Sequence, residues 1–235
     1  MNTPLKYQHI FFDLDHTLWD FETNSRQTLE HLFHTWHLQQ KGVHSFELFY
    51  KNYMVHNDKL WDRFRKGFIK IDELRWKRMW LTLLDFKIGD DKLARDLAKQ
   101  FLDLLPTRKT LFPYTVEILT YLTNKGYSLH LITNGFEQVQ HSKLQIAGIA
   151  HFFGEVITSE GSNFIKPNKE IFDYAFQKTN ALPQKSIMIG DNIEVDIQGA
   201  INAGIDQIYV NHLNIAAAIE PTYTVYSLKE LEQIF

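Results

Sequence analysis

The sequence places two carboxylates close together in "FFDLDHTL", where Asp13 and Asp15 follow a short apolar run. An isolated aspartate at such a position most often caps a turn, whereas two neighbouring acids repel one another. A carboxylate can act as a nucleophile toward phosphorus, and a second acid can donate a proton to the leaving oxygen and later accept one from water. Asp13 is therefore the candidate nucleophile and Asp15 the candidate general acid/base.

Three further motifs carry polar residues that suit the same chemistry. They are Thr133 in "LITNG", Lys166 in "IKPNKE", and Asp191 with Asp196 in "IMIGDNIEVD". Acids gathered at one place repel unless a cation joins them, and oxygen ligands in a chain without cysteine favour Mg²⁺. Lys166 can neutralise phosphate oxygens, and the hydroxyl of Thr133 can donate to them.

Apolar runs that alternate with amphipathic stretches predict an α/β fold, in which these residues end parallel strands. Strands are expected at residues 7–12, 127–135, 154–159, 185–191 and 205–211, and helices at 112–126, 136–148, 168–180, 194–204 and 227–235. Ligands of open α/β sheets bind at the carboxyl ends of strands. We therefore expect Asp13, Thr133 and Asp191 to lie at one edge of the sheet.

The segment from about Glu22 to Leu105 has a different character. It contains no proline and few glycines, and "DELRWKRMWLTLLDF" has the apolar spacing of an amphipathic helix. About four helices are expected here. We predict a Rossmann-like parallel sheet core formed by residues 1–18 and 106–235, with an all-α helical cap inserted at residues 19–105 as a lid over the same edge.

Composition narrows the class of protein. The 235 residues carry a formal net charge of −3 and include no cysteine, which excludes disulfides, thiolate catalysis and cysteine-ligated zinc. Neither a nucleic acid polymer nor a membrane is indicated as a partner, since the charge is slightly acidic and no apolar run approaches ~18 residues. We expect a cytoplasmic enzyme or binding protein, and its oligomeric state is left open.

The four motifs, in this order, resemble those of the haloacid dehalogenase superfamily of phosphohydrolases, and the helical insertion lies where the C1 cap of that family lies. The resemblance covers the whole chain. It implies an aspartyl-phosphate mechanism with Mg²⁺ as cofactor. The roles that it implies are Asp13 as nucleophile, Asp15 as general acid/base, Thr133, Asn134 and Lys166 as phosphate ligands, Asp13, Asp191 and the backbone carbonyl of Asp15 as metal ligands, Asp196 as an acid that orients Lys166 or a metal-bound water, and Thr17 as a supporting residue.

Finer similarities concern the substrate. "LITNGF", "KPNKEIFDYAF", "DIQGAINAG" and "SLKELEQIF" resemble the subgroup that includes bacterial pyrimidine 5′-nucleotidases, which implies a nucleoside 5′-monophosphate as the small-molecule phosphate ester. Asp15 argues against a true dehalogenase. A sugar-phosphate phosphatase, a phosphomutase, a phospho-acceptor signalling protein and an inactive binding protein remain open alternatives.

Several side chains have two interpretations. Trp19 and Phe21 follow the first motif, so they are candidates for substrate contact or for the core. His31, His34 and His37 recur every three residues, which is more typical of an exposed helix face than of a metal site. His16 stands where many relatives in the superfamily carry glycine or a small acid, which leaves the geometry of this turn open.

Overall fold

The computed structural model describes residues 6–216 and 218–235, which form two compact units. The first unit consists of the described residues up to Phe21 together with Lys109–Phe235, and the second is Glu22–Arg108. The sequence predicted boundaries after residues 18 and 105, each three residues before the boundary in the structure, which follows Phe21 or Arg108.

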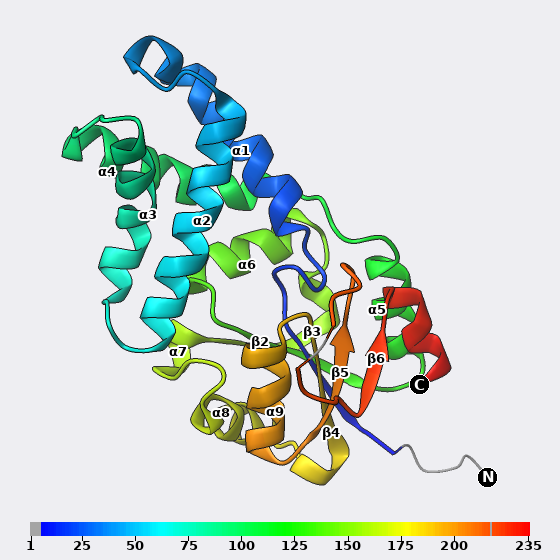
Figure 1. The fold of residues 1–235 in the computed structure, drawn as a ribbon. Coiled ribbons are helices and arrows are strands. Elements are labelled where there is room, and N and C mark those ends of the chain that lie inside the picture. Colours follow the sequence, from blue (N-terminus) through cyan, green and yellow to red (C-terminus); the bar gives the residue numbers. More distant parts are fainter. Residues whose placement is uncertain (1–5, 217) are drawn as a thin grey trace. The chain divides into compact units, whose positions relative to one another are not determined.

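The first unit contains a six-stranded sheet in which every neighbouring pair of strands is parallel (Figure 1). Its order is β3-β2-β1-β4-β5-β6. The strands are β1 His9–Phe12, β2 Ser128–Thr133, β3 Phe153–Thr158, β4 Ser186–Gly190, β5 Asp206–Val210 and β6 Tyr223–Val225. Because Phe12 pairs with Leu131 on one side and with Ile189 on the other, the carboxyl ends of β2, β1 and β4 lie side by side. The predicted α/β fold class is confirmed.

Helices cover both faces of this sheet. They are α5 Thr115–Asn124, α6 Glu137–Ile146, α7 Ser159–Ser162, α8 Lys169–Thr179 and α9 Gln198–Ala203, with short turns at η3 Ala150–Phe152, η4 Pro183–Lys185 and η5 Ile193–Ile197. In Figure 1, α8 and α9 lie on one side of the sheet and α5 on the other. Phe172 of α8 and Ala200 of α9 pack on Phe11 and Ile132 of the strands, so β1 is buried from that face.

The end of the chain differs from the prediction. A closing helix was expected at residues 227–235, but the structure has a 3₁₀ segment, η6 Leu228–Gln233. The buried residues Leu228 and Leu231 are three apart, which matches the 3₁₀ period, and Glu232 accepts a hydrogen bond from the hydroxyl of Tyr114 at 2.8 Å. Strand β6 was not predicted, since its three residues are too few to show an alternating pattern.

The second unit is helical, in agreement with the expected four helices. Its elements are α1 Phe21–Thr35, which begins at the last residue of the first unit, then η1 Leu38–Lys41, α2 Phe46–Arg65, α3 Ile71–Asp85, α4 Asp91–Leu104 and η2 Leu105–Thr107. Helix α3 packs on both α2 and α4. Side chains define the starts of two helices: Ser45 accepts from the Leu48 N–H at 3.3 Å and Asp90 from the Leu93 N–H at 2.9 Å.

The described helices include none with the length and apolar character needed to cross a membrane.

Candidate active site

Asp13 extends the central strand at its carboxyl end. Its N–H donates to the carbonyl of Ile189 at 2.8 Å, which continues the ladder between β1 and β4 by one residue. Its side chain is buried and accepts a hydrogen bond from the Lys166 ammonium at 2.6 Å. The candidate nucleophile is therefore held rigidly beside a positive charge.

Lys166 is almost fully buried, with 1% of its surface exposed, and lies in the loop before α8. Its ammonium donates to Asp13 at 2.6 Å, to Asp196 at 2.7 Å and to the carbonyl of Ile132 at 2.6 Å. An ammonium has three N–H donors, so all three are used, and a phosphate must replace one of these acceptors to contact Lys166. Burial alone would lower the pKa of Lys166, but the two carboxylates raise it above its ordinary value.

Asn134, a predicted phosphate ligand, uses its side chain on the backbone of Lys166. Its amide oxygen accepts from the Lys166 N–H at 2.8 Å, and its amide nitrogen donates to the Lys166 carbonyl at 3.0 Å. This double contact joins the loop after β2 to the loop before α8. The Asn134 side chain therefore positions Lys166 in this structure.

Asp13, Asp191 and Asp196 form an acidic cluster, in which one carboxylate oxygen from each lies within 4.8 Å of the others. Thr17 donates to Asp191 at 3.0 Å. Asp196 accepts from Lys166 at 2.7 Å and from the N–H of Asn192 at 3.0 Å. Asp191 thus lies beside Asp13, while Asp196 is tied to Lys166 and to the backbone.

The cluster carries more negative than positive charge. Burial, together with repulsion from Asp196 and Asp191, raises the pKa of Asp13 well above its usual range, although Lys166 opposes this. Burial and the charge of Asp196 raise the pKa of Asp191 to about 8. A bound divalent cation would offset this repulsion, and the donors in the cluster are the hard carboxylate oxygens that such an ion prefers. The residues therefore fit a metal ion such as Mg²⁺.

Asp15 does not point into that cluster but contacts α6. Its two carboxylate oxygens accept from the Lys143 ammonium at 2.6 Å and from the Gln140 amide at 3.0 Å. Sequence reasoning missed both partners. The only sequence signal is their three-residue spacing, which places them on one face of a helix, but glutamine and lysine are typical of a solvated face.

Thr133 ends β2 next to Asp13. Its hydroxyl oxygen accepts from the N–H of Gly135 at 3.1 Å and from the amide of Gln140 at 2.7 Å. Both bonds occupy lone pairs, so the hydroxyl hydrogen is directed elsewhere. Thr133 can therefore donate to an oxygen of a phosphate group that approaches Asp13.

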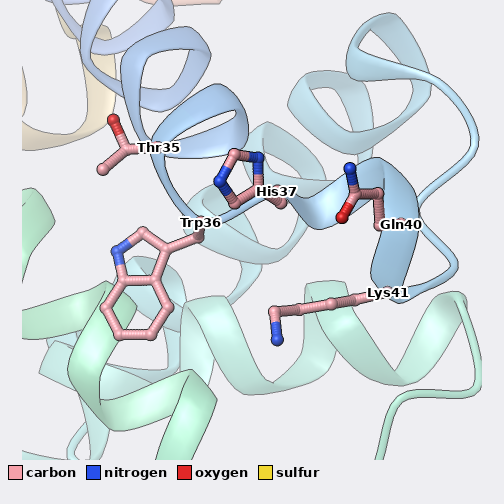
Figure 2. A pocket seen from close by; sticks show the side chains of 5 residues that line it. All are labelled: Thr35, Trp36, His37, Gln40 and Lys41. Carbon is pink, nitrogen blue, oxygen red and sulfur yellow. The ribbon is translucent and has the colours of Figure 1, made fainter.

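The other candidate residues lie in different surroundings. Trp19 is fully buried, and its ring lies 4.3 Å from the ammonium of Lys143, so it belongs to the core around Asp15. His37 lies beyond the end of α1 with a left-handed φ of 50°, so the three histidines do not share one helix. In Figure 2, His37 lines a surface hollow in the helical unit with Thr35, Trp36, Gln40 and Lys41, none of which belongs to the four motifs.

The comparisons with known proteins agree with the motifs. Residues 7–204 match the model of the haloacid dehalogenase-like hydrolase family. The chain is 33% identical to the pyrimidine 5′-nucleotidase YjjG of Escherichia coli (strain K12), over 98% of both chains. It is 31% identical to the pyrimidine 5′-nucleotidase PynA of Streptococcus pneumoniae, over 96% of this chain and 93% of that one.

A solved structure shares the whole fold. The putative HAD-hydrolase YfnB of Bacillus subtilis, in a crystal structure bound to magnesium, superposes with a TM-score of 0.88 at 27% identity, over 98% of this chain and 99% of that one. Both the family model and the full-length relatives confirm the family predicted from the motifs. The chain belongs to the haloacid dehalogenase-like hydrolases.

Proposed function

We propose that the protein is a Mg²⁺-dependent phosphomonoesterase that acts on nucleoside 5′-monophosphates, with pyrimidine bases preferred. One observation carries the reaction type: Asp13 lies between Lys166 and Asp191 at the end of the central strand, while Asp15 is held apart by its own partners. The nucleotide preference is supported by the two full-length relatives that are named pyrimidine 5′-nucleotidases.

The first chemical step is attack by a carboxylate oxygen of Asp13 on the phosphorus of the ester. A new P–O bond forms to Asp13, and the bond to the ester oxygen breaks, so that this oxygen leaves with the electron pair and takes a proton from Asp15. Lys166, whose ammonium lies 2.6 Å from the Asp13 carboxylate, places its positive charge beside the phosphoryl oxygens, which carry negative charge in the transition state. The hydroxyl of Thr133 donates to a phosphate oxygen.

The second step returns the enzyme to its starting state. Water attacks the phosphorus of the aspartyl phosphate and gives a proton to Asp15, which is now a carboxylate. The bond between phosphorus and Asp13 breaks, and inorganic phosphate leaves. Asp15 thus acts first as the acid and then as the base, while Asp13, two residues earlier in the same motif, is the nucleophile.

The side chains of Asp13 and Asp191 and the backbone carbonyl of Asp15 would hold Mg²⁺. When bound, the ion supplies positive charge that reduces repulsion between the phosphate and the carboxylates. Two further residues support this arrangement: Asp196 accepts a hydrogen bond from Lys166, and Thr17 donates one to Asp191. The helical unit, Glu22–Arg108, is the proposed cap, and substrate choice is assigned to it.

A phosphate-release assay tests this proposal. Wild type, Asp13→Asn and the surface control Asp173→Asn would be assayed with a panel of nucleoside monophosphates and sugar phosphates, in Mg²⁺ and in EDTA. We expect release that needs Mg²⁺, favours pyrimidine monophosphates, falls to background in Asp13→Asn and persists in Asp173→Asn. A preference for sugar phosphates would overturn the nucleotide assignment, and unchanged activity of Asp13→Asn would overturn the mechanism.

A further inference from the structure

Helix α6 carries two buried polar residues on the face that meets the first motif. Gln140 is fully buried, and Lys143 has 2% of its surface exposed, although lysine is rarely buried without a partner. Both contact the carboxylate of Asp15, on different oxygens. Their side chains therefore fix both the position and the rotation of that carboxylate.

Gln140 also joins Asp15 to the phosphate side of the site. Its amide nitrogen donates to Asp15 at 3.0 Å and to the hydroxyl of Thr133 at 2.7 Å. Gly135 makes room for this amide, because a Cβ added at Gly135 would overlap the Gln140 side chain. The general acid/base and the phosphate donor are thus linked through one side chain.

Lys143 is held in turn by two aromatic rings that follow the first motif, Trp19 in the loop and Phe21 at the start of α1. Its ammonium lies 4.3 Å from the ring centre of Trp19 and 5.7 Å from that of Phe21. The ring faces attract the cation and restrict its movement. The ammonium therefore presents a fixed donor to Asp15, whose side chain is still 25% exposed and so remains accessible to a substrate or to water.

We propose that Gln140 and Lys143 are positioning residues that hold the Asp15 carboxylate in the orientation needed for proton transfer. Gln140 also fixes the Asp15 carboxylate relative to the Thr133 hydroxyl. This inference deepens the proposed function and rests on it. Neither side chain touches the reacting atoms. Lys143 acts through Asp15, and Gln140 acts through both Asp15 and the Thr133 hydroxyl. Their removal leaves Asp13, Lys166 and Asp191 in place, so the attack on phosphorus is retained while the leaving oxygen loses an aligned proton donor.

The inference predicts a dependence on the leaving group. A nitrophenolate leaves without a proton, whereas the alkoxide of a nucleoside needs one. In Lys143→Met, we expect kcat/KM to fall ~10–100-fold for a nucleoside 5′-monophosphate but less than about 3-fold for p-nitrophenyl phosphate. Gln140→Leu, which also removes a contact to Thr133, should lose more activity on the nucleotide than on p-nitrophenyl phosphate. The matched control variants Lys178→Met and Gln177→Leu, which change exposed residues of α8, should leave both values unchanged.

A second measurement separates positioning from a structural role. If Lys143 acts through Asp15, then Lys143→Met should have no further effect on p-nitrophenyl phosphate or nucleotide hydrolysis once Asp15→Asn is present. Gly135→Ala, which displaces the Gln140 amide, should reproduce the leaving-group dependence of Gln140→Leu. Circular dichroism of each variant would verify that it is folded before its rates are compared.

The outcomes are distinct. Equal losses on both substrates, or losses from Lys143→Met that persist in Asp15→Asn, would overturn this inference while the proposed function stands. A wild-type protein that hydrolyses no phosphate ester would overturn the proposed function and this inference with it. A leaving-group dependence that disappears in Asp15→Asn supports the inference.

Discussion

At the scale of the residue, the two acids of the first motif coexist because each has its own lysine. Asp13 is paired with Lys166 from the loop before α8, and Asp15 is paired with Lys143 from α6, both at 2.6 Å. Each ammonium offsets the negative charge of one carboxylate, which suits the different chemical roles proposed for the two acids. Only folding brings each lysine to its acid, because the two lie more than a hundred residues apart in the sequence.

Loss of Lys166 should affect both stability and activity. Lys166→Met leaves Asp13 and Asp196 buried without their cation, and breaking a buried ion pair from one side costs about 3 kcal/mol of unfolding free energy. We also expect hydrolysis to fall about 100-fold or more, because a preorganised charge at the reacting carboxylate is lost. Urea unfolding and steady-state kinetics would measure the two effects.

The control for this variant is Lys169→Met, which removes an exposed lysine paired with Asp173 one turn along α8. Exposed pairs contribute about 0–1 kcal/mol, so its stability should be close to that of the wild type. If both lysine variants were equally stable and active, the buried position of Lys166 would have no energetic consequence, and the pairing described above would be contradicted.

The sequence predicted the acids, Thr133 and Lys166 as one constellation, but it could not predict how they are held. Gln140 and Lys143 were missed because amide and ammonium side chains on a helix normally face solvent, and nothing in the chain order indicates that they meet Asp15. Trp19 was left between core and substrate contact for the same reason. In the structure its ring packs on Lys143 and is fully buried.

At the scale of the element, prediction succeeded where an apolar run was bounded by a polar residue. The buried strands β1, β2 and β4 were each predicted from an apolar run that ends in a polar residue. The closing segment failed as a helix because Leu228 and Leu231 repeat with a period of three, and six residues do not distinguish an α-helix from a 3₁₀ helix. The helix predicted at residues 194–204 begins with a π-helical turn, Ile193–Ile197, and becomes α-helical only at Gln198.

A substitution at Gly190, the last residue of β4, tests how closely Asp196 packs against the end of this strand. A Cβ added there would overlap the carboxylate of Asp196, which is itself bonded to Lys166. Gly190→Ala should therefore destabilise the protein by about 1–3 kcal/mol and lower activity, because Asp196 and Lys166 must move together. Thermal unfolding and the phosphate-release assay would measure these effects.

Gly89→Ala is the matched control, since no atom lies within 4 Å of the Cβ that it adds. Its stability should stay within about 0.5 kcal/mol of the wild type, with unchanged activity. A Gly190→Ala variant that behaves like this control would contradict the close packing of Asp196 against β4.

At the scale of the whole molecule, the fold gathers residues from distant parts of the chain at one edge of the sheet. The order β2-β1-β4 places Thr133, Asp13 and Asp191 on neighbouring strand ends, although the chain leaves the first unit after Phe21 and returns at Lys109. That these residues meet at one edge of a parallel sheet could be expected from the alternation of strands and helices, but the strand order could not. The side chains that link the strand ends could not, because they depend on packing between elements.

The pH dependence of global stability should report the buried His130 of β2, which contacts the partly exposed His9 of β1. His130 is 6% exposed, and its Nε2 lies 3.1 Å from Nδ1 of His9. On the other side, Glu155 of β3 is its partner in the strand register. Burial, with a smaller contribution from His9, lowers the pKa of His130 to about 4 from 6.5. The folded protein therefore binds fewer protons than the unfolded chain between these pH values.

The contribution of neutral His130 to the unfolding free energy is fully present above pH 6.5, the pKa of histidine in the unfolded chain, and is lost as the pH falls toward 4. Between about pH 7.5 and about pH 5, the wild type should lose about 2 kcal/mol more unfolding free energy than His130→Gln. The control His44→Gln, which changes an exposed residue of the helical unit, should follow the wild type. Identical pH profiles for wild type and His130→Gln would show that this histidine is not held neutral.

The central claim is that phosphorus becomes bonded to Asp13, and acid quenching during turnover tests it most directly. Wild type, Asp13→Asn and Asp15→Asn would be mixed with p-nitrophenyl phosphate and Mg²⁺, quenched, digested and mapped by mass spectrometry. We predict a phosphoryl group on the peptide that contains Asp13, more of it in Asp15→Asn, where water lacks its base, and none in Asp13→Asn. Turnover by Asp13→Asn at the wild-type rate, or a phosphoryl group on another residue, would contradict the account.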